Sequence, residues 1–268
     1  REFGGCAGNI AYNLKLLGGE PIPMATVGQD FAPYRAWFDE LGIRLDQVRE
    51  VPGTFTAQAF ITTDQDNNQI TAFHPGAMNF SHLNKVEGLK GVSLGMISPD
   101  GRQGMVEHAA QFAAAGIPFI FDPGQGMPMF DGKDLLAFVD QATWVTLNDY
   151  EARLMQERTG LTAEQIADRV SALIITRGAH GSHIYTDKQR LEIPAAPIRR
   201  QADPTGCGDA YRAGLIYGLL HDMDWETAGR VASLMGAVKV ETPGTQNHRF
   251  TRSEFEARFN EAFGYSLE

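Results

Sequence analysis

Asp-Pro-Thr-Gly-Cys-Gly-Asp-Ala-Tyr-Arg-Ala-Gly, residues 203–214, is the most informative segment of this chain. Gly206 and Gly208 allow backbone N–H groups to approach an anion closely. From Ala210 to Leu220 small and apolar residues recur at helical spacing, so we expect a helix to begin beside Asp209. A glycine loop that opens a helix binds phosphate oxygens, because its amide dipoles and the helix macrodipole point the same way. Asp209 would then accept the proton of a hydroxyl that attacks the bound phosphoryl group, which predicts a small-molecule kinase.

A tight turn followed by a capping aspartate would explain the same residues without a ligand. Dinucleotide binding is excluded, because Tyr211 stands where the Gly-x-Gly-x-x-Gly fingerprint needs its third glycine. A P-loop is excluded too, since around Gly132-Lys133 the other required positions hold Met127 and Asp134. The chain also lacks the His-Arg-Asp and Asp-Phe-Gly motifs of protein kinases.

Composition limits the class of protein further. The 268 residues are 43% hydrophobic, which suits one large domain, or one domain with an inserted lid. A formal net charge of -10 argues against a nucleic-acid partner. We expect no membrane partner and a cytoplasmic location, because no apolar run reaches the length of a membrane span. Cys6 and Cys207 are too few for a disulfide framework.

Strands and helices are predicted to alternate through the middle of the chain. Strand-like runs at 92–97, 117–121, 143–147 and 172–176 are separated by helix-like runs at 103–115, 131–140 and 149–171. This order predicts a mainly parallel sheet with helices on both faces, which binds ligands at the carboxyl ends of its strands. Residues 54–62 and 69–73 have strand periodicity around a polar turn at 64–68, which predicts a β-hairpin lid at about 53–76.

Three further segments fall at the ligand-binding edge of this sheet or at a helix start. Thr176-Arg177-Gly178 and Gly181 could contact a phosphate tail, although an ordinary turn explains them equally well. Asn148 and Glu151 open a helix: Asn148 is a good N-cap, and Glu151 either suits the first turn or serves Mg²⁺ through water. Gly5 and Asn9 could line a ligand site at the start of another helix.

Phe60 and Phe73 lie on the predicted hairpin. Their rings could stack on a flat ligand ring or merely pack the lid.

In this order the motifs resemble those of the ribokinase (PfkB) family of carbohydrate and nucleoside kinases, over nearly the whole chain. Gly4-Gly5…Asn9-x-Ala11…Leu17-Gly18 resembles the family's N-terminal signature, and residues 203–214 resemble its C-terminal one. Within the family the chain is most similar to bacterial adenosine kinases. The segments that carry this similarity are 73–78, 147–151, 203–214 and 241–246.

The resemblance implies a three-layer α/β/α domain over residues 1–268 that phosphorylates adenosine with ATP in purine salvage. Asp209 would be the base, and the backbone amides of Gly206, Cys207 and Gly208 the anion hole. The implied ATP site comprises Asn148, Thr176, Arg177, Gly178, Gly181 and Gln246. The implied nucleoside site comprises Gly5, Asn9, Phe60, Phe73 and Gln125. Glu151 would serve Mg²⁺ through water, and Asp203 a loop that binds a monovalent cation such as K⁺.

Two departures from the family pattern stand out. Relatives carry a strand and a lid segment upstream of the position of Gly4-Gly5, and this segment includes an aspartate that binds substrate hydroxyls. We therefore expect the protein to have further residues before Arg1. Near Gln125, this chain has Gly126 and Met129 where adenosine kinases carry a second glutamine and an arginine, which leaves the base of the nucleoside open. The alternatives are a kinase for ribose or another sugar, an inosine or guanosine kinase, and an inactive nucleoside-binding regulator. The edges of the hairpin could also pair two subunits into a homodimer.

Overall fold

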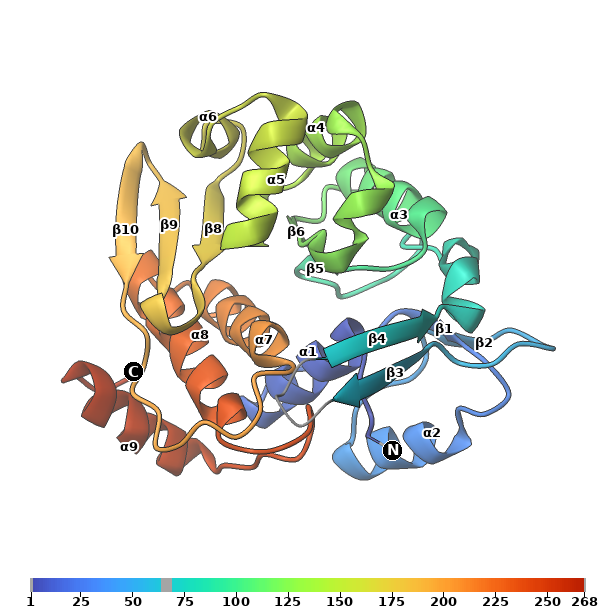
Figure 1. Ribbon diagram of the computed structural model, residues 1–268, viewed down its shortest axis with the longest axis horizontal. Helices are drawn as coiled ribbons and strands as arrows, with labels where there is room; N and C mark the ends of the chain where they lie inside the picture. Colours follow the sequence, from blue (N-terminus) through green and yellow to red (C-terminus); the bar gives the residue numbers. More distant parts are fainter. Residues whose placement is uncertain (1, 64–68, 268) are drawn as a thin grey trace.

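The computed structural model describes residues 2–63 and 69–267, and its centre is a six-stranded sheet (Figure 1). The strand order is β10-β9-β8-β7-β6-β5. The four strands from β5 to β8 are parallel, and β9 and β10 add antiparallel hairpin strands at one edge. The bounds are β5 Gly95–Ile97, β6 Phe119–Phe121, β7 Trp144–Asn148, β8 Ala172–Thr176, β9 Ser182–Thr186 and β10 Gln189–Ile193. The predicted mainly parallel sheet is confirmed.

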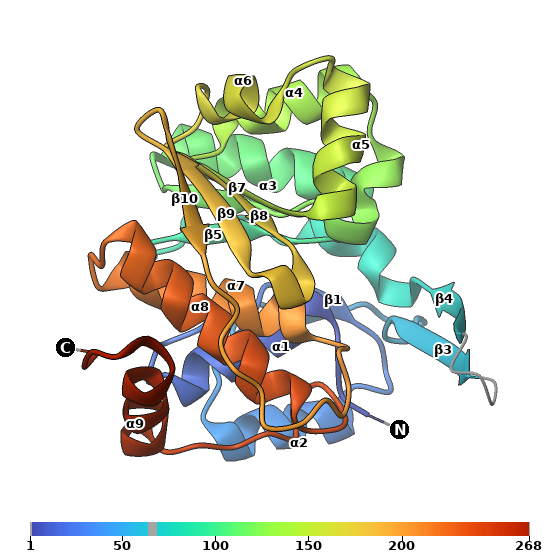
Figure 2. The same ribbon diagram turned by 60° about the vertical axis from the view of Figure 1, so that its left-hand side comes forward.

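Helices cover both faces of this sheet (Figure 2). One layer comprises α3 Arg102–Ala115, α4 Gly132–Gln141, α5 Asp149–Thr159 and α6 Ala163–Ala167; the other comprises α1 Cys6–Leu16, α7 Cys207–Leu220 and α8 Trp225–Val240. Along β8, Ala172 and Ile174 belong to the core beneath α7 and α8, whereas Leu173 and Ile175 belong to the opposite core. This alternation is what a strand buried on both faces produces.

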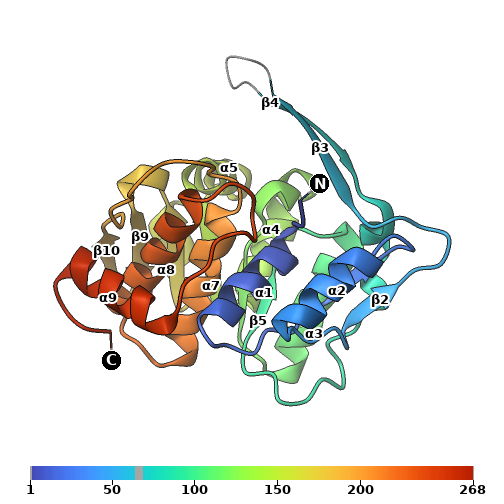
Figure 3. The ribbon, with the colours of Figure 1, turned by 90° about the horizontal axis from the view of Figure 1, so that it is seen from below.

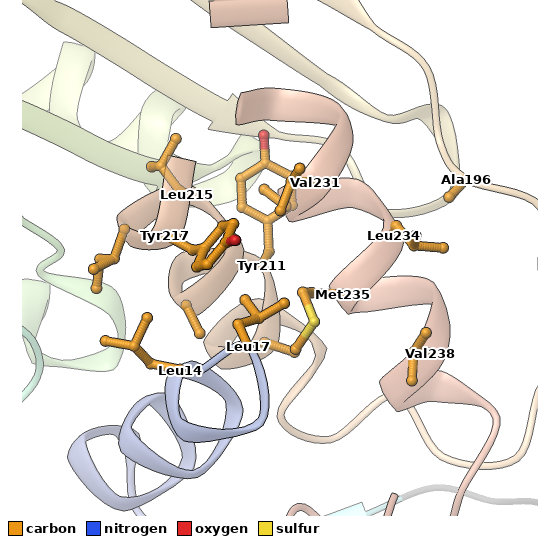
Figure 4. Close-up of a cluster of buried hydrophobic side chains, with 14 of the residues drawn as sticks. Leu14, Leu17, Ala196, Tyr211, Leu215, Tyr217, Val231, Leu234, Met235 and Val238 are labelled. Carbon is orange, nitrogen blue, oxygen red and sulfur yellow. The ribbon is translucent and has the colours of Figure 1, made fainter. Parts of the chain in front are cut away.

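Helices α1, α7 and α8 form a tightly packed core, in which residues such as Leu14, Leu17, Leu215 and Met235 meet (Figure 4). Small residues bring α7 and α8 together: a Cβ added to Gly214 would lie 2.6 Å from the Cα of Ala232. Close-packed helices of this kind have little freedom to shift against each other. The start of α7, which carries Asp209, is therefore fixed by the core beneath it.

The first part of the chain forms a smaller unit beside the main sheet. It contains the parallel pair β1 Ala25–Val27 and β2 Val48–Glu50, the helix α2 Ala32–Leu41, and the hairpin of β3 Gln58–Thr63 and β4 Gln69–His74. Figure 3 shows the hairpin projecting from the body of the protein on the side where the chain and α1 begin. The predicted hairpin is present; its predicted turn at 64–68 lies outside the described residues.

Two predicted element bounds were wrong for identifiable reasons. The first hairpin strand begins at Gln58 and not at 54, because the backbone of residues 54–56 bonds to the 28–30 loop and to Ala77 instead. The predicted helix at 149–171 is two helices, because Gly160 adopts a left-handed conformation with φ of 72° and Thr162 caps α6. The remaining elements are the 3₁₀ segments η1 Gly76–Leu83, η2 Gly124–Met129 and η3 Gly178–His180, and the helix α9 Arg252–Phe263.

Candidate active site

The start of α7 has the geometry of an anion site. Gly206 is the N-cap residue and has a left-handed φ of 82°, which glycine adopts without strain. Within the described part of the chain, no acceptor pairs with the backbone N–H groups of Gly206, Gly208 and Asp209. The prediction for Cys207 differs from the structure, because its N–H donates to the carbonyl oxygen of Pro204 at 3.1 Å. The donors open to an anion are therefore those of residues 206, 208 and 209.

Asp209 lies in the first turn of α7, partly buried, and is held by a residue of α1. The Nδ2 of Asn9 donates to the Oδ2 of Asp209 at 2.7 Å. Burial raises the pKa of Asp209 to about 6, although the Asn9 bond and the charge of Arg212 both lower it. A carboxylate with this pKa is ionised at pH 7 and is a stronger base than an ordinary aspartate. The structure thus brings Asn9 and Asp209 together, as the sequence predicted for one common site.

Asn9 is itself oriented by a chain of hydrogen bonds that begins at Trp37 in α2. The indole N–H of Trp37 donates to the Oε1 of Gln246 at 3.0 Å, and the Nε2 of Gln246 donates to the Oδ1 of Asn9 at 3.0 Å. The same Nε2 donates to the hydroxyl of Tyr34 at 2.6 Å. An indole can only donate, so this chain fixes which way both amides point and directs the Nδ2 of Asn9 at Asp209.

Gln246 therefore does not lie where the resemblance placed it. The resemblance assigned it to the ATP site, but its side chain is only 2% exposed and its amide is occupied by Asn9, Tyr34 and Trp37. The roles of the Trp37 and Tyr34 side chains were not predicted from the sequence.

A buried ion pair lies beneath the helix start. Arg212 donates to both carboxylate oxygens of Asp122, at 2.8 and 2.7 Å, and its Nη1 lies 3.3 Å from the carbonyl oxygen of Gly208. Although burial opposes the charged guanidinium, Asp122 raises the pKa of Arg212. Asp122 directly follows β6, so the pair ties the carboxyl end of the sheet to the first turn of α7. Arg212, which lies among small and apolar residues after Asp209, was the signal in the sequence for a buried ion pair.

Asn148 and Glu151 form the capping box that the spacing allowed. Asn148 donates to Glu151 through its backbone N–H at 2.7 Å and its Nδ2 at 2.8 Å, and its Oδ1 accepts from the N–H of Glu151. Burial raises the pKa of Glu151, and the nearby charge of Asp122 adds to the effect. Within residues 2–63 and 69–267 no group of three or more acidic, histidine or cysteine side chains could hold a metal alone. A Mg²⁺ ion at Glu151 would thus be shared with substrate phosphates, which is its usual mode of binding.

The segment after β8 places a cation at the same edge of the sheet. Thr176 pairs in register with Asn148, so both side chains lie at the carboxyl ends of their strands. The Nη1 of Arg177 lies 2.7 Å from the Nε2 of His183 on β9. A guanidinium can only donate, so the Nε2 of His183 accepts this bond. Burial and the charge of Arg177 lower the pKa of His183, which favours the neutral imidazole. Gly178 and Gly181 have positive φ, and a Cβ at Gly181 would lie 2.0 Å from the carbonyl oxygen of Ile193.

The expected nucleoside residues lie in three places: the start of α1, η2 and the hairpin of β3 and β4. Gly5 is the exposed N-cap of α1, and Gln125 is exposed in η2, directly after β6. The hairpin register pairs Phe60 with Ala72 and Phe73 with Ala59. Directly paired residues share a face and neighbours along a strand do not, so the two phenylalanines lie on opposite faces. The prediction that both rings line one pocket is therefore wrong. A ligand that lies on one face of the hairpin can contact only one of the two rings.

Asp30 is a further residue that sequence reasoning missed. Its Oδ1 accepts from the backbone N–H of Thr56 at 2.7 Å, and its Oδ2 accepts from the Nε2 of Gln58 at 3.0 Å. These bonds hold the base of the hairpin where it leaves the body. Nothing in the sequence marked Asp30, because its partners lie more than two dozen positions away.

Comparisons with known proteins identify the relatives of this chain. Residues 1–251 match the profile of the pfkB family carbohydrate kinases. A nucleoside kinase of Methanocaldococcus jannaschii is 31% identical over 252 residues, which are 92% of this chain and 82% of that protein. The structure of a Burkholderia thailandensis nucleoside kinase in complex with inosine is 55% identical, with a TM-score of 0.97 over 100% of this chain and 88% of that one. Another structure of that enzyme, in complex with ADP-inosine, gives a TM-score of 0.96 over 100% of this chain and 84% of that one.

Among the described residues, no helix is both long and apolar enough to cross a membrane. The matched profile covers nearly all of the chain, and its fold is that of the ribokinase relatives. The chain belongs to the pfkB family of carbohydrate kinases, and it is an ATP-dependent phosphotransferase whose acceptor is a hydroxyl group.

Proposed function

We propose that this kinase transfers the γ-phosphoryl group of ATP to the 5′-hydroxyl of a purine nucleoside, adenosine or inosine, as a step of purine salvage. The observation that carries the proposal is Asp209, held by Asn9 beside three open N–H donors at the start of α7. The likeness to a nucleoside kinase that binds inosine supports the class of acceptor. A hydroxyl acceptor between an ionised carboxylate and an anion site is the arrangement that phosphoryl transfer needs.

In the proposed mechanism, the Oδ2 of Asp209 is held by Asn9, so the Oδ1 takes the proton of the attacking hydroxyl. The N–H groups of residues 206, 208 and 209 stabilise the negative charge of the transferring group. Because that transition state is loose, most of the rate increase comes from these fixed dipoles rather than from the strength of the base. Arg177, held by His183, would bind the phosphate tail.

Glu151 fits a Mg²⁺ ion bound through water, because its buried carboxylate is oriented by two N–H groups and faces the sheet edge that carries Asn148. When bound, Mg²⁺ would neutralise charge on the ATP phosphates. The residues of this chain would hold that ion near the phosphate end of the site.

The acceptor is tested by measuring ADP release with Mg-ATP and a panel of adenosine, inosine, guanosine, ribose and fructose. We expect the purine nucleosides to give the largest kcat/KM, and product analysis to find the 5′-monophosphate. A preference for the free sugars would refute the nucleoside assignment. Nucleoside binding by calorimetry without any ADP release would instead favour an inactive regulator.

The hydrogen bonds that run from Trp37 through Gln246 and Asn9 to Asp209 predict the effect of Gln246→Leu. In Gln246→Leu the Asn9 amide loses its fixed orientation, so its bond to Asp209 weakens and the pKa of Asp209 rises. We expect kcat/KM at pH 7 to fall about tenfold, the loss of one hydrogen bond to a charged group. The acidic limb of the pH profile, near pH 6 in the parent enzyme, should move to higher pH.

His248→Leu is the matched control for this variant. The Nε2 of His248 bonds to the Oδ1 of Asn13, one helical turn along α1 from Asn9, so it joins the same two segments without reaching Asp209. The control should lose stability and keep its pH profile. An equal shift of the acidic limb in both variants would show that Gln246 acts only by holding the segment between α8 and α9 against α1.

The hairpin faces predict unequal roles for its two aromatic residues. Phe60 and Phe73 are 59% and 55% exposed, so each has apolar surface that a ligand can cover. We expect only one of Phe60→Ala and Phe73→Ala to raise the KM for the nucleoside by about tenfold, the loss of one stacked ring. Titration of each variant with the preferred nucleoside measures this, and equal increases would contradict the opposed faces.

We further propose that the hairpin pairs two subunits into a homodimer. Both of its faces carry exposed apolar side chains, among them Phe60, Ile61, Ile70 and Phe73. Exposed strands with apolar side chains are a template for pairing. Sedimentation analysis of Ile70→Lys against the parent protein tests the dimer, which the charge should weaken.

A further inference from the structure

A buried lysine contacts the Asp203 loop, which the family resemblance assigned to a monovalent cation. Lys239 is in the last turn of α8, and its side chain is fully shielded from solvent. Its Nζ donates to the carbonyl oxygen of Asp203 at 2.7 Å and to that of Thr242 at 3.2 Å. The carboxylate Oδ2 of Asp203 lies 3.9 Å away. Two backbone carbonyls and a carboxylate therefore surround an ammonium group.

This set of oxygens does not fit a separate K⁺ ion. Backbone carbonyls bind K⁺ by replacing its hydration shell. The carbonyls of Asp203 and Thr242 already accept from Nζ, so an ion bound by the same two oxygens would have to occupy the position of the ammonium. The loop can hold Lys239 or a monovalent cation there, and it holds Lys239.

We propose that the ammonium of Lys239 takes the place of the monovalent cation, so that this kinase works without K⁺. The inference rests on the proposed function in one respect: Lys239 stabilises the Asp203 loop, and that loop leads into the proposed anion site at the start of α7. The lysine supplies the positive charge from within the chain, and no ion has to be bound or released.

The contacts of Asp203 explain why this charge matters for the site. The Oδ1 of Asp203 accepts from the N–H of Thr205 at 2.9 Å, and its Oδ2 accepts from the N–H of Gly244 at 2.9 Å. Its own N–H donates to the carbonyl oxygen of Val240 at 3.0 Å. The group around Lys239 thus joins three segments: the end of α8, the turn before Gly206 and the loop that leads to Gln246.

The position on α8 also favours a cation. The carboxyl end of a helix carries a partial negative charge, which stabilises an ammonium in the last turn. Removing the ammonium would take from the carbonyls of Asp203 and Thr242 the charged donor that they share, and would leave Asp203 with only the weak Sγ donor of Cys207 at 3.9 Å. A small cation that restores their coordination would recover the loop, which makes the proposal testable by rescue.

The first experiment uses the parent protein. Initial rates with its best nucleoside and Mg-ATP are measured in KCl, NH₄Cl, NaCl and N-methylglucamine chloride at one ionic strength. Because screening is then equal, we expect rates that agree within about twofold. Several-fold activation by K⁺ would overturn the proposal.

The second experiment uses Lys239→Met, which keeps an unbranched apolar side chain as far as the ε position and removes the ammonium. In N-methylglucamine chloride we expect kcat/KM to fall by roughly tenfold or more, with partial recovery as KCl or NH₄Cl is added. The control is Lys90→Met, since Lys90 is exposed and the net charge changes equally. It should match the parent in every salt.

The outcomes distinguish a failure of the inference about Lys239 from a failure of the proposed function. A Lys239→Met enzyme that loses activity and responds to no cation would mark Lys239 as a cross-link only, and the inference would fail. If that variant does not fold, the parent series still decides. If the parent phosphorylates no nucleoside, the proposed function fails, and the thermal midpoint of the parent in K⁺ against N-methylglucamine then decides, with no difference expected.

Discussion

Asp209→Asn is expected to lower kcat by about 10²-fold or more, with little change in the KM of the nucleoside. Asparagine keeps the shape of the side chain and can still meet Asn9, but it cannot take a proton from the hydroxyl. The remaining activity would come from the N–H groups at the start of α7, which the substitution does not touch. Steady-state rates at saturating Mg-ATP measure the effect.

Asp224→Asn is the control for this variant. Asp224 is the N-cap of α8, and its Oδ1 accepts from the N–H of Thr227 at 2.9 Å. Asparagine caps a helix as well as aspartate does, so the control should match the parent in both rate and stability. Near-normal turnover by Asp209→Asn would remove Asp209 from the mechanism altogether.

Arg212→Met is expected to lower the free energy of unfolding by about 3–5 kcal/mol, because it leaves Asp122 buried without its partner. The side chains of Arg212 and Asp122 are only 7% and 5% exposed, so water cannot compensate for the lost pair. The bond to the carbonyl of Gly208 is lost as well, which should loosen the first turn of α7. Urea unfolding followed by circular dichroism gives the change in stability.

The double variant Arg212→Met with Asp122→Leu distinguishes packing from catalysis. It removes both charges, so we expect it to recover much of the lost stability, as buried ion pairs replaced by apolar residues do. Its kcat should stay low, because the link between β6 and the helix start is still missing. A double variant with restored kcat would show that the pair only supports the fold.

The sequence predicted those parts of the site that depend on neighbouring residues. The glycines before Asp209, the capping residues Asn148 and Glu151, and the alternation of buried strands each leave a local pattern. Gln246 could not be placed in this way, since its partners Asn9 and Trp37 lie more than two hundred positions away. Their contact exists only once α1 and α2 have packed.

The hairpin shows a second limit of sequence reasoning. Whether Phe60 and Phe73 share a face depends on the register, and the register depends on the turn between them. Alternation within each strand was visible, but the pairing across the strands was not. Lys239 is a different case, because a lysine between Val238 and Val240 in an apolar segment was visible in the sequence and should have suggested a buried partner.

The projecting hairpin has a consequence for how acceptor preference can diverge in such enzymes. It is anchored at its base through Asp30, whereas the groups proposed for phosphoryl transfer lie on α1 and α7. If the hairpin covers the acceptor as proposed, substitutions on it would change the contacts with the acceptor and leave the geometry at the start of α7 unchanged. Acceptor preference could then change through single substitutions on the hairpin, each of which leaves an active enzyme.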